Sequence, residues 1–141
     1  MSITWFGSIP GPIPHSSSIP SHAAATATEE WPVFRAPFAC KLKKLDIVPQ
    51  AAVTGDDTNR TNFNIIDKDA DGSGTTEVGN LDLATGVNLV AFDSTNIPLN
   101  ATYLADGVAL AEGDVVSIQH EKVGNGVLVP YCDVYIEYYP A

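Results

Sequence analysis

The strongest constraint on the fold is an alternation of apolar and polar residues that recurs in short stretches, with turn-forming residues between them. Phe38, Cys40 and Leu42, for example, alternate with small or basic neighbours, which is the two-residue period of a β-strand. No stretch of ten or more residues places its apolar side chains at the 3.6-residue spacing of an amphipathic helix. Short strands separated by turns are typical of a sandwich or barrel, so the sequence predicts an all-β domain of about seven or eight strands between residues 31 and 140.

Individual strands can be predicted from the same pattern. At Lys43-Lys44 the alternation slips by one residue and the apolar side continues at Leu45 and Ile47, which predicts a β-bulge. The further predicted strands cover residues 60–66, 88–92, 115–123 and 127–139. The turn residues Gly124-Asn125-Gly126 predict that the last two of these strands form a hairpin.

The first 28 residues differ from the rest of the chain. They contain no Lys, Arg, Asp or Glu, but they contain four prolines and six serines. Proline fixes φ and removes a donor, so this stretch is predicted to be extended. We expect residues 1–30 to form an arm and residues 31–141 to form the sandwich domain. The arm is interpreted as lying on another subunit, with a flexible tail or a first strand of its own domain as alternatives. The apolar residues that would make the contacts are Ile3, Trp5, Phe6, Ile9, Ile13 and Ile19.

Charge excludes two classes of partner. The chain carries 17 acidic residues against seven Lys and Arg, and its formal net charge is −10. A nucleic-acid backbone requires clustered positive charge, and an anionic membrane also attracts basic segments. The start of the chain has no basic segment, and prolines at 10, 12 and 14 interrupt it, so no secretory signal is predicted and synthesis in a reducing cytosol is expected.

The sequence offers little for catalysis. Cys40 and Cys132 are the only cysteines and are predicted to be buried thiols, with a disulfide as the alternative. His15 and His22 lie in the arm. His120 falls in phase with the apolar residues of its predicted strand and is interpreted as a partly buried sheet residue. We therefore predict no enzymatic activity, no catalytic residues and no cofactor.

Residues 67–78, DKDADGSGTTEV, begin like a calcium-binding EF-hand loop. Gly72 fits the sixth position, but Val78 stands at the twelfth position, where the loop needs a bidentate Glu. Glu77 is one residue early, and a predicted strand precedes the loop where an EF-hand has a helix. Glycine and aspartate also suit a turn between strands. A solvated turn is the favoured interpretation, and a weak calcium site is the alternative.

Two groups of residues are candidates for an interface. Four of the seven basic residues fall within ten positions: Arg35, Lys41, Lys43 and Lys44. In the last predicted strand, one side carries Leu128, Cys132, Val134 and Ile136, and the other carries Tyr131, Tyr135 and Tyr139. The basic group either neutralises nearby acids or meets an acidic partner. The tyrosines are either covered by a neighbouring loop, part of a subunit interface, or a platform for sugar stacking.

The chain resembles a known family over about residues 33–139. The neutral arm is followed by FRAPFACKLKKLDIVPQAAVTGDDTNRTNFNIIDKDADGSGT and later by LAEGDVVSIQHEKVGNGVLVPYCDVYIEYY. This pattern, with its Gly-Ser-Gly-Thr loop at 72–75 and its turn at 111–114, resembles the small jelly-roll decoration (cement) and head-fibre-base proteins of tailed bacteriophages.

The resemblance implies an eight-stranded jelly roll that forms a homotrimer and binds the major capsid protein on the outside of the virion after synthesis in the host cytoplasm. It also implies that the first and last strands of the domain are neighbours, so Cys40 and Cys132 are expected to lie close together. A carbohydrate- or receptor-binding module is the alternative function, because jelly rolls serve both purposes.

Overall fold

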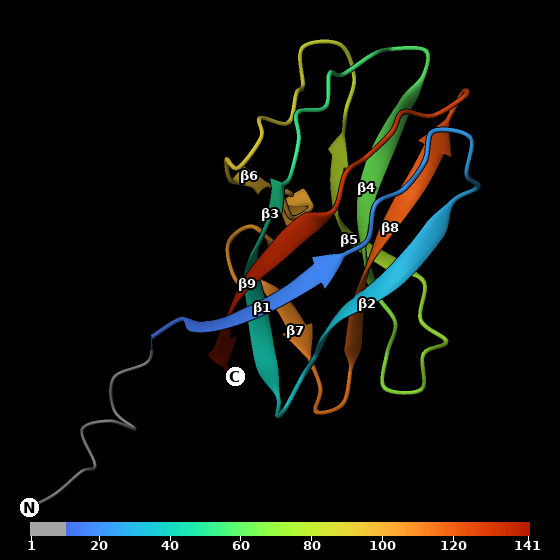
Figure 1. Ribbon diagram of the computed structural model, residues 1–141. Coiled ribbons are helices and arrows are strands. Elements are labelled where there is room, and N and C mark those ends of the chain that lie inside the picture. The colour runs from blue at the N-terminus through green and yellow to red at the C-terminus, as the bar shows by residue number, and fades with distance from the viewer. Residues whose placement is uncertain (1–10) are drawn as a thin grey trace, which may run out of the picture.

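The computed structural model describes residues 11–141 and shows a sandwich of two antiparallel sheets (Figure 1). One sheet has the strand order β1-β9-β3-β6, with β7 also pairing with β3, and the other has the order β2-β8-β4-β5. The all-β prediction is confirmed. The elements are β1 (Ile13–Ile19), β2 (Glu29–Arg35), β3 (Cys40–Pro49), β4 (Arg60–Asp67), β5 (Thr76–Asp82), β6 (Thr95–Asn96), the short 3-10 helix η1 (Ala101–Tyr103), β7 (Val108–Leu110), β8 (Val115–Val123) and β9 (Cys132–Pro140).

The core lies between the two sheets, where the inward residues of each strand meet. Its largest side chains have no solvent exposure because both sheets contribute branched and aromatic residues at alternate positions. They include Leu42, Leu45, Ile47, Phe63, Ile65, Ile118 and Ile136. Among the described residues, no helix is long and apolar enough to cross a membrane.

The N-terminal strand corrects the predicted boundary between arm and sandwich. β1 pairs antiparallel with β9 along its whole length, from Ile13 opposite Tyr138 to Ile19 opposite Cys132. Ile19 is fully buried and Ile13 packs against the core. The segment is held in the sheet by its backbone pairing with β9 and by these two apolar side chains, although the residues between them are polar. Ile3, Trp5, Phe6 and Ile9 lie outside the described residues, so an arm before β1 stays a prediction.

The predicted hairpin of the last two strands is wrong. β8 and β9 belong to different sheets, and the connection between them crosses the end of the sandwich. Gly124 and Gly126 do turn the chain, with φ of 62° and 71°, values that favour glycine. Val129 then exchanges two backbone hydrogen bonds with His22, which holds the connection against the β1–β2 connection. Leu128 is therefore 58% exposed in a loop and does not share the apolar side of the strand.

Of two further predictions, the bulge at Lys43-Lys44 is confirmed and the strand at residues 88–92 is wrong. The pairing of β3 with β9 shifts register between Leu42 and Lys44, so the predicted bulge is confirmed. Residues 88–92 do not form a strand, because only Leu89 pairs, in an isolated bridge with Val53. Phe92 has a φ of 59° and is exposed, which ends the extended conformation there.

The two cysteines are far apart. β3 and β9 are neighbours, as expected, but they run antiparallel, so Cys40 lies opposite Pro140 and Cys132 lies opposite Pro49. Nine residues of strand separate the two positions, which is roughly 30 Å. A disulfide requires Cα atoms within about 7 Å. The expectation that the thiols lie close together is wrong, and both are free and buried.

Candidate functional site: the two outer sheet faces

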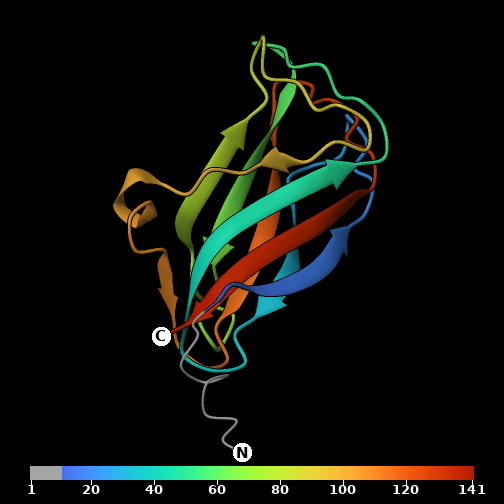
Figure 2. The same cartoon turned by 90° about the vertical axis from the view of Figure 1, so that its left-hand side faces the viewer.

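The outer face of β9 and β3 brings together residues from both predicted interface groups, and Figure 2 shows this face of the molecule. Lys41 lies opposite Tyr139, and Lys44 lies opposite Glu137 one pleat further along. Tyr135 lies between Asp46 of β3 and Ser16 of β1. We call this surface the tyrosine–lysine face, defined by Lys41, Lys44, Tyr135, Glu137 and Tyr139.

Hydrogen bonds on this face mostly run along single strands. The Tyr135 hydroxyl donates to Glu137 Oε1 over 3.0 Å, and this hydrogen bond raises the pKa of Tyr135. Lys44 Nζ lies 3.2 Å from Asp46 Oδ2, and the same contact raises the pKa of Lys44. Asp46 is the exception, because it also accepts from Asn96 of β6 over 2.9 Å. The charge of Lys44 is thus compensated locally, while Tyr135 and Tyr139 stay partly exposed.

The remaining predicted interface residues lie elsewhere. Arg35 ends β2 in the other sheet, so the four basic residues do not form one stripe. Lys43 occupies the bulge and donates to the Ala105 carbonyl over 3.0 Å. Tyr131 precedes β9 and is 42% exposed, and its hydroxyl donates to Asp133 Oδ1 over 2.8 Å.

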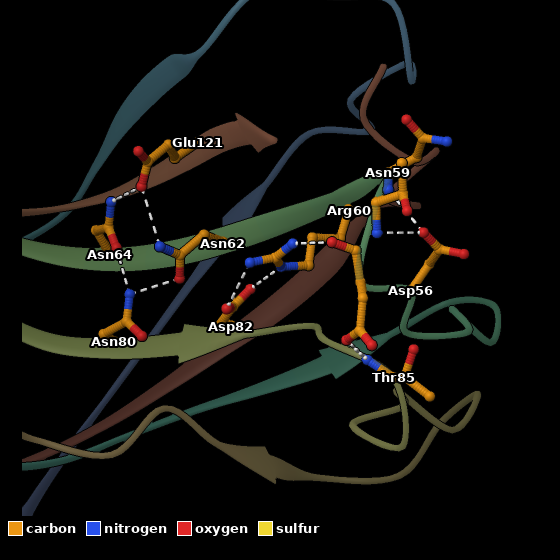
Figure 3. Close-up of polar contacts among 11 residues, drawn as sticks. Asp56, Asn59, Arg60, Asn62, Asn64, Asn80, Asp82, Thr85 and Glu121 are labelled. Carbon is orange, nitrogen blue, oxygen red and sulfur yellow. Dashed lines mark hydrogen bonds and ion pairs between the residues drawn. The ribbon is translucent and has the colours of Figure 1, made fainter. Parts of the chain in front are cut away.

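The opposite outer face carries a network of side-chain amides that the sequence analysis missed (Figure 3). Asn80 of β5 donates to Asn62 and Asn64 of β4 over 2.5 and 2.6 Å. Asn62 and Asn64 each donate to Glu121 Oε2 of β8, over 3.0 and 2.9 Å. Asn64 also donates to Gln119 over 2.9 Å. This amide network joins three neighbouring strands through their side chains.

Asn64 is the centre of the network and is only 4% exposed. Both of its amide hydrogens are used, one on Gln119 and one on Glu121, and its carbonyl oxygen accepts from Asn80. A buried amide with all these partners is a structural link, because burial without them would be costly. A signal was present in the sequence, since Asn62 and Asn64 are two residues apart, as are Gln119 and Glu121, and so share one face of their strands.

A cavity of about 320 Å³ opens beside the network. Lys68 Nζ lies 3.2 Å from Glu30 Oε1 at its wall, and Ser117 donates to the same oxygen over 2.5 Å. Glu30 and Lys68 on this wall are therefore paired with each other. The lining residues are Glu30, Asn64, Ile66, Lys68, Thr75, Glu77, Gln119 and Glu121.

Arg60 and Asp82 close the other end of this face. Arg60 Nε and Nη2 donate to the two carboxylate oxygens of Asp82 over 2.5 and 3.0 Å, and this contact raises the pKa of Arg60. Arg60 also donates to the Asp57 carbonyl over 2.6 Å. The two parallel hydrogen bonds to Asp82 fix β4 against β5, and the bond to Asp57 fixes β4 against the loop that precedes β4.

The loop of residues 68–75 connects β4 to β5, so strands flank it on both sides. Asp67 accepts from the Asp69 amide over 3.0 Å, while burial raises its pKa. Asp71 accepts from both the amide and the hydroxyl of Ser73, and these bonds lower its pKa. These are local turn contacts of the kind that aspartate favours. Within residues 11–141, no group of three or more His, Cys, Asp or Glu side chains is placed to hold a metal ion. That the loop is structural stays a prediction.

His120 is buried more deeply than the sequence suggested. It has no exposed surface, and its ring packs edge-on against Phe63, Trp31 and His22, with centroid separations of 4.7, 4.8 and 5.1 Å. Neither ring nitrogen has a hydrogen-bond partner among the described residues. Burial lowers the pKa of His120 to about 3, with a smaller contribution from His22. The expectation of partial burial is wrong, because the rings of Trp31, Phe63 and His22 surround the side chain completely.

No protein-family model, curated protein or solved structure matches this chain. The geometry described above and the resemblance noted in the sequence are therefore the grounds for a functional proposal.

Proposed function

We propose that this protein is a structural decoration protein of a tailed-phage head, which attaches to the outside of the assembled capsid as a homotrimer. The observation that carries the proposal is the tyrosine–lysine face. Lys41 and Tyr139, which the sequence separates by almost 100 residues, are direct neighbours on one broad sheet surface. Tyrosine and a basic side chain with its long apolar stem suit a protein–protein contact.

The strand order supports the jelly-roll part of this proposal. Successive strands from β1 to β4 alternate between the two sheets, as do β8 and β9. Among the strands of residues 11–141, only β4–β5 is a hairpin of two full-length neighbours, and β6 and β7 both pair with β3. This winding supports the proposal of a jelly roll, a double-sheet β fold that occurs in viral capsid and lectin domains.

The mechanism requires no chemistry. A protein that binds the assembled capsid but not its separate subunits stabilises the assembly by mass action. Three copies held together add avidity without any new contact, provided that all three reach their sites at once. The neutral segment before β1 would extend that reach, because an extended chain spans up to about 3.3 Å per residue.

The test is co-sedimentation with heads assembled from the major capsid protein of the genome that encodes this chain. The wild-type protein should pellet with the heads, and light scattering should give a trimer. The double variant Lys41→Glu, Tyr139→Ala should lose most of this binding. Arg35→Glu is the matched control, because it reverses a charge of the same sign on the other sheet. Equal binding by both variants contradicts a contact through the tyrosine–lysine face.

The segment before β1 is tested separately by removing residues 1–10, which leaves every described strand in place. We expect the shortened protein to melt like the full chain and to bind heads more weakly. Unchanged binding would show that the segment has no part in attachment.

A carbohydrate- or receptor-binding module is the second candidate. It is favoured by Tyr131, whose ring is exposed and whose hydroxyl is held by a neighbouring carboxylate. A glycan array run beside the co-sedimentation assay separates the two functions.

A further inference from the structure

A second, smaller cavity of about 190 Å³ lies where β3 ends, between that end and two connections of the chain. Figure 1 shows the β3–β4, β5–β6 and β8–β9 connections gathered at the upper end of the sandwich, away from both chain ends of the described region. The lining residues are Val48, Pro49, Gln50, Phe92, Tyr131 and Asp133.

Phe92 is the unusual member of this group. It is 78% exposed, and its φ of 59° lies in the left-handed region that aromatic residues rarely adopt. Its backbone amide donates to the Pro49 carbonyl over 2.8 Å, which fixes it at the edge of the cavity. A side chain this exposed adds little to the core, so packing does not explain why the backbone is held in this conformation. Such strain is common at binding sites.

One more backbone contact holds the rest of the cavity together. The Gln50 amide donates to the Tyr131 carbonyl over 2.9 Å, so the end of β3 is tied to the β8–β9 connection. Pro49, which accepts the hydrogen bond from the Phe92 amide, directly precedes Gln50 in the chain. The two aromatic residues therefore come from distant parts of the sequence but are anchored to consecutive residues at the end of β3, Phe92 to Pro49 and Tyr131 to Gln50.

The polar rim has capacity left for a ligand. Asp133 accepts the Tyr131 hydroxyl at Oδ1, which orients the carboxylate. Among the described residues, Asp133 Oδ2 and the side-chain amide of Gln50 take part in no hydrogen bond within the protein. A carboxylate oxygen accepts hydrogen bonds, and an amide both donates and accepts them.

We propose that this cavity is a binding subsite for one neutral saccharide ring. The apolar C–H side of a sugar would contact Phe92 and Tyr131, and its hydroxyl groups would hydrogen-bond Asp133 and Gln50. Binding sites for small molecules combine an apolar lining with a few placed polar groups in this way. The free carboxylate and the chain's net charge of −10 disfavour an anionic sugar, and a single carboxylate is too few for a metal ion.

The site gives the second candidate function a location, but it does not conflict with capsid attachment. The cavity adjoins the tyrosine–lysine face, because Val48 and Asp133 lie on the same side of the β3–β9 pair as Tyr135. Its two aromatic residues, Phe92 and Tyr131, lie beyond that face, in connections at one end of the sandwich. A decoration protein that carries this site would bind sugars at that end of the sandwich, while Lys41 and Tyr139 at the other end of the face contact the capsid. The two proposals can therefore fail independently. A failed sugar experiment does not contradict capsid attachment, and a failed co-sedimentation does not contradict sugar binding.

The probes are methyl glycosides of neutral hexoses and N-acetylhexosamines, screened by saturation-transfer NMR on the full chain after a glycan array. We expect at least one neutral glycan to bind with a dissociation constant near or below millimolar, and we expect Phe92→Gly to weaken it about tenfold or more. Glycine suits a φ of 59°, so this variant removes the ring while relieving the backbone. Asp133→Asn should weaken the same glycan, and Tyr131→Phe should do so less, because it keeps the ring.

The matched control is Phe38→Ala, which removes another exposed phenylalanine next to the opposite end of β3. It should leave glycan binding unchanged. The proposal is overturned if no neutral glycan binds, or if Phe92→Gly and Asp133→Asn bind as well as the wild type. Light scattering tests a further outcome. If no glycan binds and Phe92→Gly abolishes self-association, the cavity is a contact between copies of the chain and the proposal is overturned.

Discussion

On the outer face of β4, β5 and β8, side-chain hydrogen bonds run across strands, whereas on the outer face of β9 they run along one strand. Asn80, Asn64 and Glu121 come from three different strands and form one chain of hydrogen bonds. Tyr135 and Glu137, by contrast, are two residues apart on β9. A cross-strand contact stabilises the sheet because it exists only when both strands are in register. A contact within a strand survives any change of partner strand.

This difference distinguishes the amide network from the face that we propose for binding. The amide network uses its polar groups on itself, so a ligand would have to break existing hydrogen bonds to enter. The tyrosine–lysine face pairs Lys44 with Asp46 of its own strand and leaves the rings of Tyr135 and Tyr139 partly accessible. Polarity alone would not have distinguished the two faces. The direction of the hydrogen bonds does, and it leads to predictions about which substitutions affect stability and which affect binding.

The largest loss of stability is expected for Asn64→Ala. Removing this side chain leaves Asn80, Gln119 and Glu121 short of partners in a half-buried setting, so we expect a loss of about 2–3 kcal/mol in the free energy of unfolding. Urea denaturation of the wild type and the variant measures it. Thr75→Ala is the control, because Thr75 lines the same cavity but is exposed. Equal midpoints for Asn64→Ala and Thr75→Ala would show that the network does not join the strands energetically.

Acid should be the next largest effect, and we expect it to act through His120, whose two ring nitrogens are both buried without a hydrogen-bond partner among the described residues. His120 has an ordinary pKa of 6.5 when unfolded and a pKa of about 3 when folded. Since the folded pKa is the lower one, the unfolded chain binds the proton first, and stability present above pH 6.5 is lost as the pH falls toward 3. At about pH 4.5 the loss is expected to be about 2–3 kcal/mol.

The measurement compares urea denaturation of the wild type and His120→Leu between neutral and acidic pH. Other groups also titrate in this range, so the informative quantity is the difference between the two proteins. The wild type should lose more stability than the variant as the pH falls. Parallel pH profiles would contradict a neutral, desolvated ring at this position.

The sequence predicted those features of the fold that depend on local patterns. The strand at residues 60–66 and the bulge at Lys43-Lys44 follow from alternation, which is a property of the strand itself. The sheet to which each strand belongs depends on distant partners. Gly124 and Gly126 fix a turn, but whether β9 then pairs with β8 or crosses to β3 is decided by core packing over the whole sandwich. The amide network was missed for the same reason, since only the order β8-β4-β5 places its members side by side.

The candidate binding face was partly predictable. The tyrosines and Lys41 were singled out by type and spacing, but their proximity depends on the β3–β9 register. Arg35 shared the same stretch of sequence and yet lies in the other sheet. The segment of Ile13–Ile19 has few strongly apolar residues, so its membership of the sheet rests on backbone pairing with β9, which composition does not reveal.

A small effect on stability is expected for Tyr135→Ala on the tyrosine–lysine face. Its hydroxyl bonds only to Glu137 on the same strand, so its removal should not uncouple β9 from β3 or β1. We expect a loss less than about half of that for Asn64→Ala, measured by the same urea denaturation. Tyr135→Phe serves as the control, because it removes the hydroxyl alone. A loss from Tyr135→Ala that equals or exceeds the Asn64→Ala loss would remove the distinction between the two faces.

The smallest effect concerns the thiols on the inner side of the tyrosine–lysine sheet. Cys40 and Cys132 are buried at opposite ends of the β3–β9 pair, and burial raises the pKa of Cys132 to about 12. Because the thiolate is the reactive form, neither cysteine should react with iodoacetamide in the native protein, and the melting temperature should not depend on reducing agent. Mass spectrometry after denaturation without a reductant should show two alkylated cysteines. Rapid labelling of Cys132 in the native state would show that this end of β9 opens. A mass two daltons low with no alkylation would show a disulfide, which the strand register does not allow.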